Sequence, residues 1–132
     1  MKDIDVEFNI DLLLQQGISA HQAGNLQEAE RCYKSILETQ STHPHASHNL
    51  GALYVSINKS EAALNLFKTA FQVNPNIEQF WMSYISTLIN ERQFTEAKQA
   101  LKKAKRKGAN KNKLNDLNQH LISIANGSKL PQ

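Results

Sequence analysis

The chain has 132 residues, a length that fits one ordinary domain, and its 40% hydrophobic and 20% charged composition supports a buried core. Its single cysteine, Cys32, excludes a disulfide framework and a zinc site built from several thiolates. The net charge is +3, but residues 1–40 carry −4, residues 41–97 carry −1 and residues 98–132 carry +8. No apolar run approaches the ~20 residues that cross a bilayer, and the acidic start is unlike a secretory signal. These features predict a soluble protein of a reducing compartment, the cytoplasm.

Taken in chain order, the apolar residues predict seven amphipathic helices separated by short breaks. Apolar and small side chains recur at steps of three and four, which is the period of a helix with one buried face. Gly24 and Asn58 lie at two of the breaks and suit the left-handed conformation that closes a helix, whereas Arg92 suits it less. Pro44 suits the first turn of a helix, with Thr42 or His43 as its cap. The expected helices cover residues 8–23, 26–39, 44–57, 60–73, 77–90, 94–107 and 111–125.

The pattern itself repeats every 34 residues, so each unit is predicted to be a helix, a tight turn and a second helix. A glycine on the first helix is expected to face an alanine on the second and let the backbones approach. The aromatic residue four positions after that alanine is expected to fill the space between units. The residues in register are Gly17, Gly51 and Ile85; Ala29, Ala63 and Ala97; and Tyr33, Phe67 and Leu101.

The last expected helix has an apolar face and a polar face. Its leucines and isoleucine fall at steps of three and four, and the opposite side carries asparagine, aspartate and glutamine. A terminal helix of this kind covers the open end of a stack of repeats and keeps it soluble. The apolar residues are Leu114, Leu117, Leu121 and Ile124.

These units resemble the tetratricopeptide repeat family over residues 8–126, and the second unit carries the best match. Its matching residues are Leu50, Gly51, Tyr54, Ala63, Phe67 and Pro75. The resemblance implies an all-α fold, a right-handed α-solenoid of three antiparallel helix pairs plus a capping helix. The implied divisions are a domain at 1–126 with repeats near 10–43, 44–77 and 78–110, a capping helix near 111–126, and a linker or tail at 127–132.

The resemblance also implies a non-catalytic module that binds a protein or peptide, on the concave side formed by the first helix of each unit. The side chains on that side form an apolar strip with polar flanks, which suits an amphipathic helix or an apolar peptide. The alternative is that several of them pack against neighbouring helices. The expected groove residues are Leu14, Ile18, His21, His45, His48, Asn49, Ala52, Val55, Gln79, Met82, Ser86 and Ile89.

Two binding modes known in the family match this chain poorly. A clamp for a C-terminal carboxylate needs lysines, arginine and asparagines, but only Asn49 fits, and Ile18 and Ser83 stand at other clamp positions. In the second mode, a row of asparagines holds a peptide backbone. This chain matches that asparagine ladder only in part, because Gln15 and Ser83 stand at two of the asparagine positions. We therefore reject the clamp and expect at most a partial ladder.

Three other functions stay open. The segments at 43–51 and 74–81 also resemble repeat blocks that precede catalytic domains in bacterial glycosyltransferases, sulfotransferases and methyltransferases, so the chain is hypothesised to be an N-terminal accessory or dimerisation domain of a larger transferase. Residues 98–113 hold eight basic and no acidic side chains, which suits an acidic partner or nucleic acid, although stacking aromatics are missing. The apolar start, with Phe8, Ile10 and Leu12–Leu14, allows self-association, in which its acidic flank meets the basic end of another copy.

No arrangement of residues predicts catalysis, a cofactor or a metal. The phosphate-binding, dinucleotide-binding, nucleophile-elbow and zinc-protease motifs are missing from the sequence. His43, His45 and His48 have a spacing that a metal can use, but no carboxylate lies near them in sequence, so capping and surface roles are favoured. Cys32 has no recognisable base and is interpreted as a structural thiol.

Overall fold

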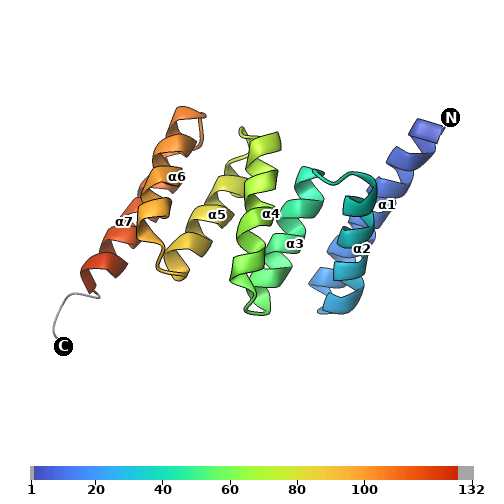
Figure 1. The fold of residues 1–132 in the computed structure, drawn as a ribbon, viewed down its shortest axis with the longest axis horizontal. Helices are drawn as coiled ribbons and strands as arrows, with labels where there is room; N and C mark the ends of the chain where they lie inside the picture. Colours follow the sequence, from blue (N-terminus) through green and yellow to red (C-terminus); the bar gives the residue numbers. More distant parts are fainter. Residues whose placement is uncertain (1, 128–132) are drawn as a thin grey trace. The chain divides into compact units, whose positions relative to one another are not determined.

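The described part of the chain is all-α, as predicted. The computed structural model describes residues 2–127, and side-chain environments for residues 7–124 and 126. Its helices are α1 (Lys2–Gln22), α2 (Leu26–Thr39), α3 (Pro44–Ser56), α4 (Ser60–Val73), α5 (Glu78–Asn90), α6 (Phe94–Arg106) and α7 (Lys111–Gly127). Successive helices are joined by short connections (Figure 1), and α1 packs on α2, α3 on α4 and α5 on α6. Within residues 2–127, no helix is both long and apolar enough to span a membrane.

The observed helices follow the expected ranges closely, with the main difference at the start of α1. This helix begins at Lys2 instead of near residue 8, because residues 2–7 contain neither glycine nor proline to stop it. The helix expected at 111–125 continues to Gly127, so the expected tail keeps only residues 128–132, which lie outside the described residues.

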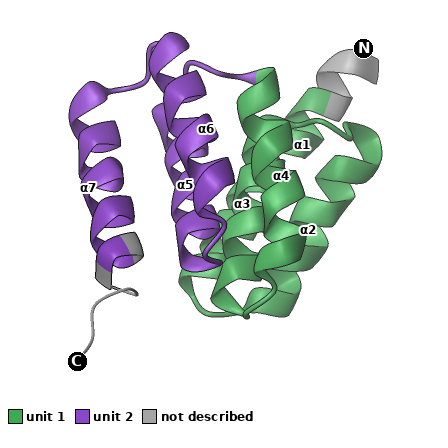
Figure 2. Cartoon of the chain, turned by 60° about the vertical axis from the view of Figure 1, so that its left-hand side comes forward, with its two compact units in different colours: residues 1–73 green, residues 74–132 purple. Residues whose placement is uncertain are grey.

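The chain divides into two compact units, which Figure 2 colours separately. The first unit ends at Val73 and contains α1 to α4, with α3 packed on both α2 and α4. The second begins at Asn74 and contains α5, α6 and α7, and α7 packs on the other two helices. Leu114, Leu117 and Leu121 are buried on the inner side of α7, as expected for a capping helix.

The turns inside the three helix pairs repeat the same hydrogen bond at a spacing of 34 residues. In each turn, a backbone N–H donates to the carbonyl oxygen five residues earlier. The bonds run from Asn25 to Ala20 at 2.8 Å, from Lys59 to Tyr54 at 2.7 Å, and from Gln93 to Leu88 at 2.8 Å. This bond closes the end of the first helix in each pair by using a carbonyl that the helix itself leaves unpaired. The 34-residue repeat that the side-chain pattern predicts is therefore also present in the backbone geometry of the turns.

A residue with positive φ precedes each of these donors. Gly24 has φ 82°, and Asn58 has φ 64°, in agreement with the expectation for both. Arg92, which we expected to suit this conformation less, adopts it as well with φ 61°. Its guanidinium carbon lies 5.5 Å from the centre of the Phe94 ring. A left-handed backbone conformation at a non-glycine residue costs about 1–2 kcal/mol of conformational free energy. The interactions formed when the helix pair closes outweigh this cost.

The α3 helix begins with the cap that its sequence indicates. His43 Nδ1 accepts a hydrogen bond from the Ala46 N–H at 3.1 Å, and Pro44 occupies the first turn. Proline suits that position because its missing N–H would have no partner within the helix. The ring nitrogen of His43 therefore has a structural role at the start of α3.

Close packing in the first two helix pairs depends on a glycine facing an aromatic ring. A Cβ atom on Gly17 would lie 2.6 Å from Cε1 of Tyr33, and one on Gly51 would lie 2.6 Å from Cε1 of Phe67. We expected these glycines to face Ala29 and Ala63, and the two atoms nearest to each Cβ position belong to the aromatic residue four positions after that alanine. The aromatic side chain of the same pair fills the space above the glycine, because only a residue without Cβ leaves room for it.

The alanines in register are nevertheless equivalent. Ala29, Ala63 and Ala97 are all 0% exposed, and each donates its N–H to the carbonyl four residues earlier. In the third pair, Ile85 takes the glycine position and Leu101 takes the aromatic position, and both are buried. A larger side chain on the first helix thus accompanies a smaller one on the second, which keeps the packed volume similar.

We predict that Gly51→Ala lowers the free energy of unfolding by about 1–2 kcal/mol. The added methyl group overpacks the Phe67 ring, which costs ~1–3 kcal/mol, while the better helix propensity of alanine offsets up to about 1 kcal/mol. Urea denaturation followed by circular dichroism measures the change.

Phe67→Leu provides the partner variant for a double-mutant cycle. Combining it with Gly51→Ala should destabilise the protein by less than the sum of the single changes, because the smaller side chain leaves room for the methyl group. Strictly additive effects would show that the glycine is not needed for the ring.

Candidate functional site

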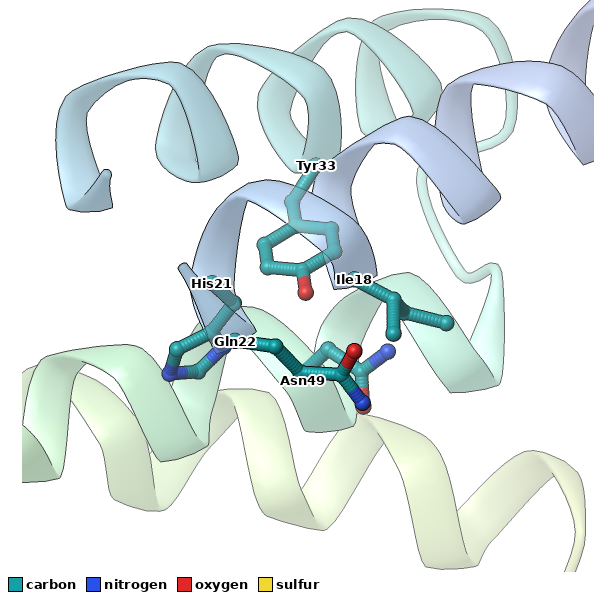
Figure 3. A pocket seen from close by; sticks show the side chains of 5 residues that line it. All are labelled: Ile18, His21, Gln22, Tyr33 and Asn49. Carbon is teal, nitrogen blue, oxygen red and sulfur yellow. The ribbon is translucent and has the colours of Figure 1, made fainter. Parts of the chain in front are cut away.

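The first unit contains a cavity of about 380 Å³ to which three helices contribute. Ile18, His21 and Gln22 come from the C-terminal half of α1, Tyr33 comes from α2, and Asn49 comes from α3. The cavity therefore exists only because the first helix pair packs against the next helix. Figure 3 shows the Tyr33 hydroxyl directed towards the side-chain amides of Gln22 and Asn49, with Ile18 beside them.

Tyr33 is the most deeply buried residue of this set. The residue is 1% exposed, its ring packs where Gly17 leaves room, and the His21 ring meets it edge-on with centroids 6.3 Å apart. Burial raises the pKa of the Tyr33 hydroxyl, which therefore stays a neutral hydrogen-bond donor at physiological pH. Among the described residues, this hydroxyl has no hydrogen-bond partner, so it is available to a ligand in the cavity.

Asn49 presents an amide at the other side of the cavity. The side chain is partly buried, and its Oδ1 lies 3.3 Å from Nδ1 of His48. The His48 ring packs on Phe67 with centroids 5.4 Å apart, and burial lowers the pKa of this imidazole, which favours the neutral form. A neutral imidazole and two carboxamides can donate and accept hydrogen bonds without carrying charge.

Three of the expected groove residues, Ile18, His21 and Asn49, are brought together around the cavity. Gln22 and Tyr33 complete it, and the sequence analysis did not select them. Gln22 lies one helical turn after Ile18, and this spacing would have indicated that both residues are on the same side of α1. Tyr33 was interpreted only as a space-filling residue. The close packing over Gly17 places its hydroxyl at the cavity, and no sequence pattern shows that.

The other expected groove residues differ in their exposure. Ile89 is only 1% exposed, so it belongs to the buried core of α5 and is not part of an accessible face. His45 and Gln79 are exposed, and Gln79 donates a hydrogen bond to Ser83 Oγ at 3.1 Å. The partly buried ones are Leu14, His48, Ala52, Val55, Met82 and Ser86.

The described residues contain no group of three histidine, cysteine or carboxylate side chains placed to hold a metal ion. His43 caps α3 through Nδ1, and its ring meets that of His45 edge-on with centroids 6.2 Å apart. Cys32 is buried, and its burial raises the pKa of the thiol, which disfavours the reactive thiolate. These arrangements agree with the structural roles that the sequence favoured.

The relative position of Tyr33 and Asn49 depends on how α2 meets α3. The Tyr54 hydroxyl on α3 donates to Glu30 Oε2 on α2 at 2.8 Å, and Lys34 Nζ lies 3.0 Å from the same oxygen. The hydrogen bond from Tyr54, and secondly that from Lys34, lower the pKa of the Glu30 carboxyl. This polar link therefore supports the helix contact on which the cavity depends.

We predict that Tyr54→Phe lowers the free energy of unfolding by about 1 kcal/mol at neutral pH. Because folding lowers the pKa of Glu30, the associated stability is present above the ordinary carboxyl pKa and is lost as the pH falls through the folded-state value. The variant should therefore lose stability less steeply on acidification than the parent chain. Urea denaturation at a series of pH values measures both effects.

Tyr33→Phe is the matched control for this measurement. It also removes one buried phenol hydroxyl, but that hydroxyl bonds to no described residue, so stability should change by less than about 0.5 kcal/mol. Equal effects of the two substitutions, or identical acid profiles for Tyr54→Phe and the parent chain, would contradict the assigned link.

Comparison with known proteins places residues 44–77 in the tetratricopeptide repeat family. No curated protein matches the chain. The first TPR of Spaghetti (RPAP3), solved with the HSP90 peptide SRMEEVD, has a TM-score of 0.74 at 18% identity, over 89% of this chain and 94% of that chain. The type III secretion chaperone SycD of Yersinia enterocolitica, in complex with a peptide of the translocator YopD, has a TM-score of 0.71 at 17% identity, over 90% of this chain and 91% of that chain.

A mutant O-GlcNAc transferase of Thermobaculum terrenum is also similar, with a TM-score of 0.70 at 20% identity over 78% of this chain. The matching region is only 20% of the transferase chain. At these identities the likenesses concern the fold, and they agree with the α-solenoid of helix pairs expected from the sequence.

Proposed function

We propose that this tetratricopeptide repeat protein is a non-catalytic interaction module that binds a peptide segment or helix of a partner protein through the first helices of its repeats. The observation that carries the proposal is the cavity of the first unit. There the apolar Ile18 lies beside an unpaired Tyr33 hydroxyl and the carboxamides of Gln22 and Asn49. The proposal places the module in the cytoplasm, where a single reduced thiol such as Cys32 is ordinary.

The chemistry of the cavity suits an uncharged stretch of peptide. A peptide backbone has one donor and one acceptor per residue, and carboxamides can pair with both. Ile18 supplies an apolar contact for one side chain of the ligand. Because Tyr33 is packed in place over Gly17, little side-chain ordering accompanies binding.

The further contact residues are the accessible ones expected from the sequence, which excludes Ile89 because it is buried. Their mixture of apolar and polar side chains suits an amphipathic or apolar segment more than a strongly acidic one. In the first unit the proposed contact residues are Leu14, Ile18, His21, His45, His48, Asn49, Ala52 and Val55, with Gln22 and Tyr33 added from the cavity, and in the second unit they are Gln79, Met82 and Ser86.

Two similar structures support a peptide as the ligand. RPAP3 was solved with an HSP90 peptide, and SycD with a peptide of YopD. The chain lacks the basic side chains of a carboxylate clamp, since Ile18 and Ser83 occupy two of those positions. We therefore propose an internal peptide segment as the ligand and not a free C-terminus.

Peptides selected from a random library on the immobilised chain test the proposal, with isothermal titration calorimetry of the best binder. Ile18→Asp and Asn49→Ala should each weaken binding by about tenfold or more, since a change of 1.4 kcal/mol corresponds to tenfold. Tyr33→Phe should also weaken binding while leaving stability unchanged, because its hydroxyl has no partner in the described protein.

Asn65→Ala is the matched control, because Asn65 is exposed on α4 away from the cavity residues and should not affect binding. The result that contradicts the proposal is a selected peptide whose affinity is the same for the parent chain, Ile18→Asp and Asn49→Ala, with all three folded by circular dichroism.

A second candidate is an N-terminal accessory or dimerisation domain of a larger transferase. The likeness to part of the O-GlcNAc transferase favours it, because there a similar fold belongs to a longer enzyme. Reading the gene beyond the codon for Gln132 tests this candidate. We expect an open frame long enough for a catalytic domain; a stop codon directly after Gln132 would remove this candidate and leave the interaction module.

A further inference from the structure

The outer side of α6 carries several exposed basic side chains. Its inner side is buried through Ala97, Ala100, Leu101 and Ala104, which fixes the opposite side towards solvent. None of the described ion pairs uses a cation of α6. The exposed cations of this basic face are Lys98, Lys102, Lys103, Lys105 and Arg106.

The N-terminal half of α1 carries the complementary chemistry. Phe8 and Leu12, which lie one helical turn apart, are 62% and 51% exposed and are the most exposed large apolar side chains described. Glu7 and Asp11 are also exposed one turn apart and take part in no described ion pair. They border a hollow of about 220 Å³. We call these four residues the α1 acidic–apolar face.

We propose that the basic face of α6 binds the α1 acidic–apolar face of a second copy of this chain. Lysine and arginine side chains can cover apolar surface with their methylene stems while their charged ends reach carboxylates. This contact buries Phe8 and Leu12 and pairs Glu7 and Asp11 with lysines. No partner other than the chain itself is needed to explain both surfaces.

The charge distribution selects a contact between unlike faces over one between like faces. Residues 1–40 carry −4 and residues 98–132 carry +8, so two acidic faces repel each other, and two basic faces do the same. Only the pairing of the acidic–apolar face of one copy with the basic face of another brings unlike charges together. Because the contact joins two copies, association increases with concentration.

The composition of the basic face favours a protein partner over nucleic acid. Seven of the eight cations in residues 98–113 are lysines, and this segment contains no aromatic residue for base stacking. Binding of nucleic acid would also leave Phe8 and Leu12 uncovered. The proposed contact leaves the peptide cavity open, because Ile18, His21 and Gln22 lie in the other half of α1. It is therefore independent of the proposed function.

Two charge-reversal variants test the proposal by sedimentation velocity at low ionic strength. One carries Glu7→Lys with Asp11→Lys, and the other carries Lys102→Glu with Arg106→Glu. The parent chain should associate more strongly as concentration rises and less strongly as salt is added. Each variant alone should associate at least about tenfold more weakly. The α1 reversal gives both faces positive charge, and the α6 reversal lowers the charge of the five named cation positions from +5 to +1.

An equimolar mixture of the two variants should recover the association, because each then presents a face complementary to the other. Lys68→Glu, which reverses an exposed charge on α4, is the control and should associate like the parent chain. Circular dichroism of all the variants establishes that they are folded.

Three results would overturn the proposal. The first is a parent chain that is monomeric at every concentration. The second is association that survives the α6 reversal, which indicates a symmetric contact between α1 helices. The third is a monomeric parent chain that binds a single-stranded RNA oligonucleotide in fluorescence anisotropy with strong salt dependence, which makes the basic face a phosphate-binding surface.

Discussion

The first unit depends on a single kind of contact, an aromatic ring packed over a helical glycine. Tyr33 over Gly17 and Phe67 over Gly51 hold each helix pair together at a distance that any Cβ would prevent. Close packing of this kind cannot relax gradually, because protein interiors are as dense as organic crystals. The pair geometry is therefore set by these contacts, and the equivalent turns at Gly24 and Asn58 follow from the same 34-residue spacing.

The same contact also produces the candidate site. Because Gly17 lets the Tyr33 ring lie close to α1, the hydroxyl reaches the cavity that residues of α1, α2 and α3 line. The link between Tyr54 and Glu30 then keeps α3, and with it Asn49, in place beside α2. A residue that packs in the core thus contributes its polar end to the proposed binding site.

Helix α1 has two different surfaces along its length. Its C-terminal half faces the cavity through Ile18 and His21, whereas its N-terminal half exposes Phe8 and Leu12 beside the carboxylates of Glu7 and Asp11. The proposed peptide binding and self-association therefore use separate residues of one helix and do not compete for side chains.

The sequence by itself determined the helices, their pairing and the 34-residue repeat, because helix periodicity and turn residues are local properties. It also selected Ile18, His21 and Asn49 as candidate groove residues, and these three line the cavity. Tertiary structure decided the rest: that the Tyr33 ring provides the atoms nearest to Gly17, that Arg92 accepts a left-handed conformation, that Ile89 is buried, and that the Tyr33 hydroxyl reaches the cavity. Those outcomes depend on how side chains from separate helices fill a shared volume, and no residue spacing along one helix specifies that volume.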